Sequence, residues 1–154
     1  MTFEKIDMRF LALTLLRLSL GWLFFYAGIT KVINPAWSAA GYLNTAKTFP
    51  ELYHWFASPG ILPVTNFLNE WGLTLVGISL LLGVFVRWGA YAGALLMILY
   101  YFPILQFPYP SASAFIVDQH IIFIAIFLYL TTLSPESIRG VEYWFRNKYL
   151  LSAK

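Results

Sequence analysis

Residues 10–33 read FLALTLLRLSLGWLFFYAGITKVI, and this stretch decides the class of the protein. Its only charged side chains are those of Arg17 and Lys31. The stretch is longer than the roughly 20 mostly apolar residues that a helix needs to cross the hydrocarbon core of a membrane. Because its apolar residues are continuous rather than alternating, it does not read as a strand of a closed barrel. We predict a transmembrane helix that ends at Asn34-Pro35. It is too long for a signal-peptide core, so we expect the mature protein to keep it.

The composition of all 154 residues agrees with a membrane protein. The chain is 60% hydrophobic and 11% charged, whereas a soluble domain is about 45–50% apolar and about 25% charged. The net charge of +3 sits at the ends of apolar runs and forms no patch. A soluble domain, a disordered tail and a nucleic-acid binder are therefore excluded. The chain has no cysteine, so it cannot relay electrons through thiols or ligate an iron–sulfur cluster by itself.

Three further apolar runs cover residues 64–86, 89–105 and 114–133. Together with residues 10–33 they give four candidate spans. We predict an all-α fold, a polytopic membrane four-helix bundle, with residues 1–154 forming a single integral membrane domain.

The ten basic residues predict the orientation of these spans. With a cytoplasmic N-terminus, seven of them lie on the cytoplasmic side: Lys5, Arg9, Arg87, Arg139, Arg146, Lys148 and Lys154. Lys31 and Lys47 then lie outside, and Arg17 lies within a span. Since basic residues concentrate in cytoplasmic loops, we expect a multi-pass protein of the cell (inner) membrane with both termini cytoplasmic.

Two segments lie outside the spans. Residues 36–63 carry more aromatic side chains than a connection needs, and we expect one or two short helices in the outer interface, broken at Pro50. Ser134-Pro135-Glu136 has the chemistry of a helix start. The residues that follow mix Trp144 and Phe145 with basic side chains, which predicts an amphipathic helix on the anionic inner leaflet.

Ionisable residues within a span are costly and usually face the bundle interior. A rise of about 1.5 Å per residue places Glu70, Tyr100 and Asp118 in one layer in the outer third of the membrane. Lys31 lies above this layer and Arg17 below it. His120, two positions from Asp118 on a helix, is expected to point about 160° away from it.

Two carboxyls at one apolar level do not both ionise readily, and a protonated carboxyl beside a phenol can exchange protons with a ligand. We therefore predict two catalytic residues, Glu70 and Asp118. The predicted ligand-binding residues are Arg17, Lys31, Tyr100 and His120. The structural alternatives are that Glu70 pairs with a cation to fix packing and that Asp118 only favours a helix dipole. Arg17 and Lys31 can instead be interfacial anchors, Tyr100 an interfacial tyrosine and His120 a packed histidine.

No recognised spacing for a metal or haem is present, because the chain offers two histidines and no cysteine. There is also no phosphate loop, dinucleotide fingerprint or nucleophile elbow. We expect neither metal nor haem, and the cofactor that we expect is a quinone.

Two blocks of sequence resemble the DoxX/DoxD family. The first runs from Arg17-Leu-Ser-Leu-Gly21 to Phe24-Phe25-Tyr26-Ala27-Gly28-Ile-Thr-Lys31, and the second holds Glu70, Gly77, Leu80 to Gly83 and Arg87. Asp118 also fits the pattern. The resemblance implies a prokaryotic four-helix membrane protein; its DoxD branch is the quinone-linked subunit of thiosulfate:quinone oxidoreductase. The sequence departs from many members after the fourth span, where a glycine-rich ending is missing, and we expect no fused partner domain within these 154 residues.

We therefore expect a membrane subunit of an oxidoreductase that binds a quinone or a similar lipid-soluble carrier in the outer third of the bundle. Whether the chain is an enzyme by itself stays open, since it holds no electron source of its own. A soluble or periplasmic redox partner and a homo-oligomer are both compatible with the sequence. Two alternatives remain: a small-molecule carrier or exporter, and a membrane scaffold for a soluble redox partner.

Overall fold

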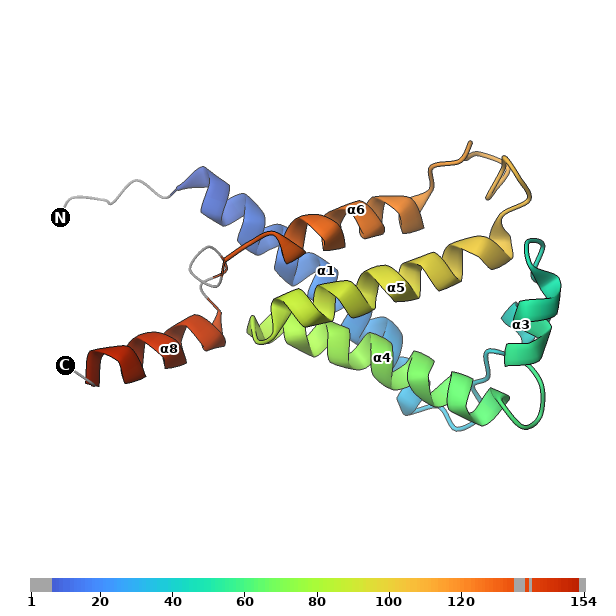
Figure 1. Ribbon diagram of the computed structural model, residues 1–154, viewed down its shortest axis with the longest axis horizontal. Coiled ribbons are helices and arrows are strands. Elements are labelled where there is room, and N and C mark those ends of the chain that lie inside the picture. Colours follow the sequence, from blue (N-terminus) through green and yellow to red (C-terminus); the bar gives the residue numbers. More distant parts are fainter. Residues whose placement is uncertain (1–6, 135–137, 139, 153–154) are drawn as a thin grey trace.

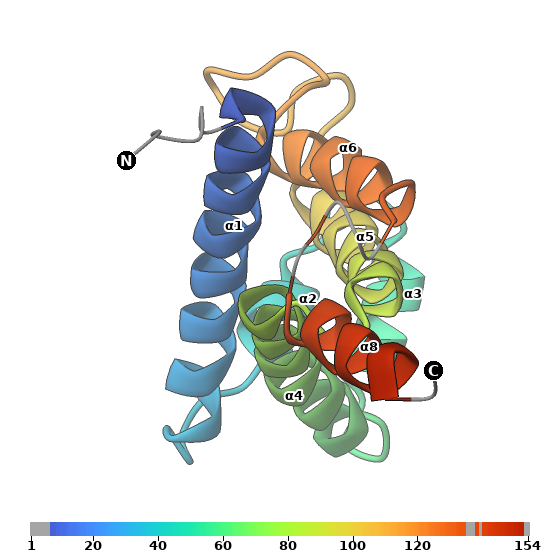
Figure 2. The same ribbon diagram turned by 90° about the vertical axis from the view of Figure 1, so that its left-hand side faces the viewer.

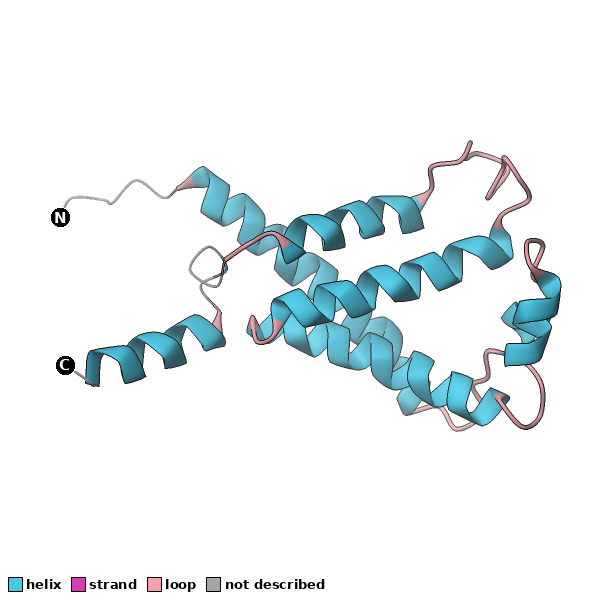
Figure 3. Cartoon of the chain, viewed as in Figure 1, coloured by secondary structure: helices cyan, strands magenta, loops and turns pink. Residues whose placement is uncertain are grey.

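A computed structural model describes residues 7–134, 138 and 140–152. These residues form seven α-helices and no β-strand (Figures 1 and 3). The helices are α1 (Met8–Val32), α2 (Ala40–Asn44), α3 (Pro50–Phe56), α4 (Leu62–Leu82), α5 (Val86–Ile104), α6 (Gln119–Thr131) and α8 (Val141–Ser152). The prediction of an all-α fold is confirmed for this part of the chain.

The four long helices pack in sequence, α1 on α4, α4 on α5 and α5 on α6. One apolar core joins all four helices, and its largest fully buried side chains include Phe24, Leu80 and Phe127. The rings of Phe24 and Phe127 meet edge-to-face with centroids 5.0 Å apart, a favourable geometry for aromatic pairs. Glycines bring the backbones together: a side chain on Gly28 would strike the backbone of Thr74, and one on Gly77 the backbone of Phe25.

The ends of the helices form two groups. The start of α1, the turn between α4 and α5, and α8 lie at one end of the molecule, while α3 and the loop after α5 lie at the other (Figure 1). Viewed from the first of these ends, α8 lies in front of α4 and α5 (Figure 2). The long helices therefore alternate in direction along the chain.

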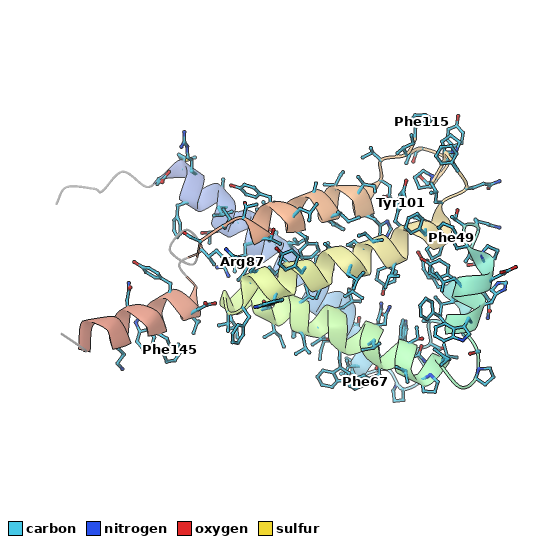
Figure 4. The ribbon with its side chains drawn as sticks, viewed as in Figure 1. Phe49, Phe67, Arg87, Tyr101, Phe115 and Phe145 are labelled. Carbon is cyan, nitrogen blue, oxygen red and sulfur yellow. The ribbon has the colours of Figure 1, made fainter. Side chains whose placement is uncertain are left out.

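Large apolar side chains cover the outside of these helices. Exposed residues on all four long helices include Trp22, Phe67, Leu75, Leu95 and Leu128, and Phe67 projects outward from α4 (Figure 4). Of the helices described, α1 is long and apolar enough to cross a membrane by itself. An apolar surface of this extent is typical of a protein that contacts lipid or a partner rather than water alone.

The four long helices differ from the expected spans by one to five residues at their ends, and two of these differences have a visible cause. α4 ends at Leu82 instead of Val86, because Gly83 adopts a left-handed conformation (φ 67°) that stops the helix. α6 begins at Gln119 instead of residue 114, because Asp118 is extended and accepts hydrogen bonds from the first amides of the helix. In the loop before it, Gln106 bridges to Tyr109 and Ser111 to Ala114.

The two segments outside the long helices also contain helix. Residues 36–63 form α2 and α3, and α3 begins at Pro50, the predicted break. In the C-terminal region, the described helix α8 begins at Val141. Pro135 and Glu136, on which the predicted helix start depends, lie outside the described residues.

Candidate ligand pocket

A cavity of about 330 Å³ lies between the α2–α3 segment and the helices α4 and α5. This cavity, which we call the ligand pocket, is lined mainly by apolar and aromatic side chains. Its lining residues are Lys31, Trp37, Ser38, Ala39, Tyr42, Leu43, Tyr53, Phe56, Thr65, Leu68, Asn69, Leu96, Leu99 and Tyr100. An apolar pocket with a few convergent polar groups is the usual form of a small-molecule site.

Three polar side chains from three helices meet in the wall of the ligand pocket. The Lys31 ammonium donates to Asn69 Oδ1 at 2.8 Å and to the Tyr100 hydroxyl oxygen at 3.0 Å. The Asn69 amide also donates to the Tyr100 hydroxyl oxygen. A phenol oxygen has two acceptor sites and one proton, so both acceptor sites of Tyr100 are occupied. Its own O–H finds no acceptor among the described residues and can donate to a further acceptor.

The Lys31 ammonium also lies between two aromatic rings. It is 4.7 Å from the centroid of Trp37 and 5.4 Å from that of Tyr100, distances at which a cation is attracted to a ring face. Glu70 acts on Lys31 through its charge and forms no salt bridge within the described residues. The Lys31 ammonium has three N–H donors and uses two of them, so one N–H is available to a further acceptor.

Two tyrosines attach the α2–α3 segment to the end of α5. Tyr42 donates to the Tyr100 carbonyl at 2.5 Å, and Tyr53 donates to the Leu99 carbonyl at 3.0 Å. Pro103 has no amide hydrogen, so the carbonyl of Leu99, four residues earlier, lacks its helical partner. Burial raises the pKa of Tyr42 and of Tyr53, which keeps both phenols protonated as donors. The segment is therefore hydrogen-bonded in place over the ligand pocket.

A smaller cavity of about 190 Å³ shares Lys31 and Tyr100 with the ligand pocket. His120 is its third polar lining residue, and the rest of the lining is apolar. His120 Nδ1 lies 2.6 Å from Asp118 Oδ2. The two side chains meet because Asp118 is the extended N-cap residue of α6. The expectation that His120 points away from Asp118, which treated both as helical, was wrong.

The family of the chain follows from its first two-thirds. The family model for DoxX matches residues 12–106, more than half of the chain. The chain belongs to the DoxX family. No curated protein and no solved structure matches it. DoxX is a membrane family, in keeping with the apolar helix α1. The match includes the whole ligand pocket, whereas Asp118 and His120 lie beyond it.

Two arginines of the DoxX pattern lie away from the ligand pocket. The Arg17 guanidinium donates to the carbonyl of Leu80 and, at 3.3 Å, to that of Leu81, near the end of α4. Arg87 Nε donates to the Thr131 carbonyl at the end of α6 at 3.1 Å. Arg87 lies at the opposite end of the helices from Tyr101 and Phe49 (Figure 4). Both side chains donate hydrogen bonds to carbonyls at the C-terminal ends of helices, where positive charge is favourable.

The structure brings some of the predicted site residues of this DoxX protein together and leaves others apart. Lys31, Tyr100 and His120 share one cavity, and Asp118 joins them through His120. Glu70 lies beside Asn69 in the chain and reaches Lys31 by charge alone. Arg17 is not brought to this group. No cluster of three or more metal-ligating side chains occurs within the described ranges.

Sequence reasoning missed Asn69, Tyr42 and Tyr53. Asn69 could have been detected from the sequence. A side-chain amide in an apolar span needs a hydrogen-bond partner, just as an ionisable group does. Tyr53 was detectable only through Pro103, whose missing N–H leaves the Leu99 carbonyl without a helical partner, and no sequence signal pointed to Tyr42. Which tyrosine reaches which carbonyl of α5 depends on the fold of residues 36–63, and no local sequence pattern reveals that fold.

Proposed function

We propose that this DoxX protein is a multi-pass membrane protein that binds a quinone or a similar lipid-soluble ring compound, as the membrane subunit of an oxidoreductase. In this proposal α1, α4, α5 and α6 are the four spans, and the ligand pocket is the binding site. The pocket volume of about 330 Å³ falls in the range of about 300–1,000 Å³ typical of small-molecule sites.

The observation that carries the proposal is the unused proton of Tyr100. Because Lys31 and Asn69 occupy both acceptor sites of this phenol, its O–H is left for an acceptor that the described residues do not supply. A ring carbonyl is such an acceptor, and the remaining N–H of Lys31 can serve the same oxygen. The aromatic rings of the pocket supply the apolar faces that a quinone ring needs.

Glu70 is the proposed source of exchangeable protons on the α4 side. Its carboxyl lies within electrostatic range of Lys31 and is half-buried. A carboxyl in this position can balance the charge of Lys31 while a ligand oxygen gains or loses a proton.

The proposed orientation places the ligand pocket near the outer face. The end of the molecule that holds the α4–α5 turn and α8 carries Arg9, Arg87 and Lys148, while the pocket end carries Lys31 and Lys47. Since basic residues favour the cytoplasmic side, the α2–α3 segment would lie outside. Electrons would then come from a small reductant or from a soluble or periplasmic partner that reaches this side.

The proposal is tested by ligand analysis of the purified protein. We expect organic extraction followed by mass spectrometry to recover a quinone, and a short-chain benzoquinone to bind the delipidated protein in nanodiscs. Tyr100→Phe should weaken this binding about tenfold, the effect of one hydrogen bond of about 1.4 kcal/mol. Tyr91→Phe, on the exposed face of α5, is the matched control.

Other outcomes would contradict the proposal in distinguishable ways. A stoichiometric partner protein without quinone would favour a scaffold. Counterflow of a solute in vesicles would favour a carrier. Benzoquinone binding that is equal in wild type and Tyr100→Phe would remove the ligand pocket from the proposal.

A further inference from the structure

The smaller cavity brings together a base, a cation and a phenol from three helices. Lys31 comes from α1, Tyr100 from α5 and His120 from α6, and apolar residues such as Phe24, Leu73 and Met97 form most of the remaining wall. Its volume of about 190 Å³ exceeds the roughly 30 Å³ share of one water molecule several times. A hydroxyl group therefore has room there beside three polar partners.

Asp118 favours one tautomer of the His120 ring. Asp118 Oδ1 accepts from the His120 amide at 2.9 Å and from the Ile121 amide at 3.3 Å, which caps α6. The other oxygen, Oδ2, is 2.6 Å from His120 Nδ1. Beside a carboxylate the neutral imidazole keeps its proton on Nδ1, so Nε2 has a free lone pair. Nε2 has no hydrogen-bond partner within the described residues.

Capping alone does not account for this arrangement. An N-cap needs one side-chain oxygen, and asparagine or serine supplies it equally well. Here the second carboxylate oxygen fixes an imidazole that lines a cavity, at side-chain exposures of only 15% for His120 and 10% for Asp118. A base fixed by a carboxylate, with a cation nearby, is the arrangement used for proton abstraction.

We propose that His120, positioned by Asp118, takes a proton from a hydroxyl-bearing ring compound whose hydroxyl occupies the smaller cavity. This inference rests on the proposed function and assigns to the site the reduced, phenolic form of its ligand. The O–H bond breaks, an N–H bond forms on Nε2, and the electron pair stays on the ligand oxygen. Lys31 stabilises the oxyanion, and Asp118 stabilises the imidazolium. The step is a proton transfer and needs no oxidant.

The charged and titratable groups around His120 are consistent with this step. Asp118 faces it from its own segment, Lys31 from α1 and Tyr100 from α5. From α4, Glu70 acts on Lys31. Tyr42 and Tyr101 interact electrostatically with Asp118. The oxyanion formed in the step neutralises the charge of Lys31.

The chain offers a clean spectroscopic test because it has only two histidines. His54 lies exposed on α3, so His54→Gln leaves His120 as the single imidazole without touching either cavity. We expect ¹⁵N spectra of this variant to show the neutral ring protonated on Nδ1. Asp118→Asn keeps a capping oxygen but presents an amide N–H to Nδ1, and it should move the proton to Nε2. An Nε2-protonated ring in the parent would overturn the proposal.

The proton transfer itself is read with 4-nitrophenol, which absorbs differently when ionised. At a pH below its solution pKa, we expect the bound probe to show about a tenfold higher ratio of phenolate to phenol than the free probe, one unit of pKa. His120→Phe and Asp118→Asn should abolish this increase while retaining binding. Asp118→Ser, which preserves the cap alone, should abolish it too.

The outcomes separate this inference from the proposed function. Ionisation that persists in His120→Phe would assign the effect to Lys31 and overturn the role of His120. Benzoquinone binding without any ionisation of nitrophenol would overturn this inference and leave the proposed function standing. Failure of the wild-type chain to bind either probe would overturn both.

Discussion

At the scale of single residues, the same kind of side chain serves two different purposes in this protein. Lys31 lies against two aromatic rings and contacts a phenol and an amide at a cavity wall. Arg17 has a relative exposure of only 6% and donates to the backbone carbonyls of Leu80 and Leu81. Both were predicted to bind ligand because each is a cation in or near a span. Their contacts point to a ligand for Lys31 and to helix ends for Arg17.

Arg17→Met should therefore separate stability from binding. The substitution leaves the Leu80 carbonyl without its donor, which costs about 1–3 kcal/mol for a buried group. We expect a lower Tm in nanodiscs and an unchanged Kd for a short-chain benzoquinone. A weakened Kd at unchanged Tm would place Arg17 in the ligand site after all.

At the scale of elements, contact between α1 and α4 depends on glycine. Gly77 faces the backbone of Phe25, and Gly28 faces that of Thr74. Small residues allow such close approach between membrane helices. The pocket residues Lys31 and Asn69 come from these two helices, so their 2.8 Å hydrogen bond depends on the same close packing.

Gly77→Ala should push α1 away from α4. The added methyl group meets backbone atoms that cannot rotate aside, and overpacking of this kind costs about 1–3 kcal/mol. Thermal unfolding should show the loss. Gly60→Ala is the matched control, because nothing lies within 4 Å of the Cβ that it adds. An equal Tm for the two variants would mean that the helices do not approach as closely as described.

The α2–α3 segment depends on its tyrosine hydroxyls in a comparable way. Tyr53→Phe removes the donor to the Leu99 carbonyl at about 1 kcal/mol. Amide hydrogen exchange of residues 40–56 should then quicken about fivefold, with α1 and α4 unchanged. Tyr91→Phe should leave exchange as in the wild type, and acceleration spread evenly over the chain would contradict a local attachment.

The sequence predicted the existence of these elements better than their ends. Apolar length is enough to indicate α1, α4, α5 and α6, and Pro50 marks the start of α3. The start of α6 was misplaced because apolar residues before Asp118 continue the hydropathy of the helix while the backbone is already extended. That one error separated Asp118 from His120. Side-chain pairing across helices, such as Lys31 with Asn69, depends on rotation and depth that hydropathy does not encode.

At the scale of the whole molecule, exposed apolar side chains cover the sides of the helices, and basic residues lie at their ends. Exposed side chains such as Trp22, Leu75 and Leu95 form its sides. Among the described residues, the α8 end carries Arg9, Arg87 and Lys148, whereas the pocket end carries Lys31 and Lys47. The proposed orientation, with a bilayer around the sides and the cytoplasm at the α8 end, accounts for both features.

Cysteine labelling tests this orientation directly, because the chain has no cysteine of its own. Ser58→Cys lies just after α3 at the pocket end, and Lys148→Cys lies exposed on α8. In sealed cells or spheroplasts we expect an impermeant maleimide to label the first and to spare the second until the membrane is opened. The variant without an introduced cysteine is the blank. The reverse pattern would turn the ligand pocket toward the cytoplasm, and the electron donor would then have to be sought there.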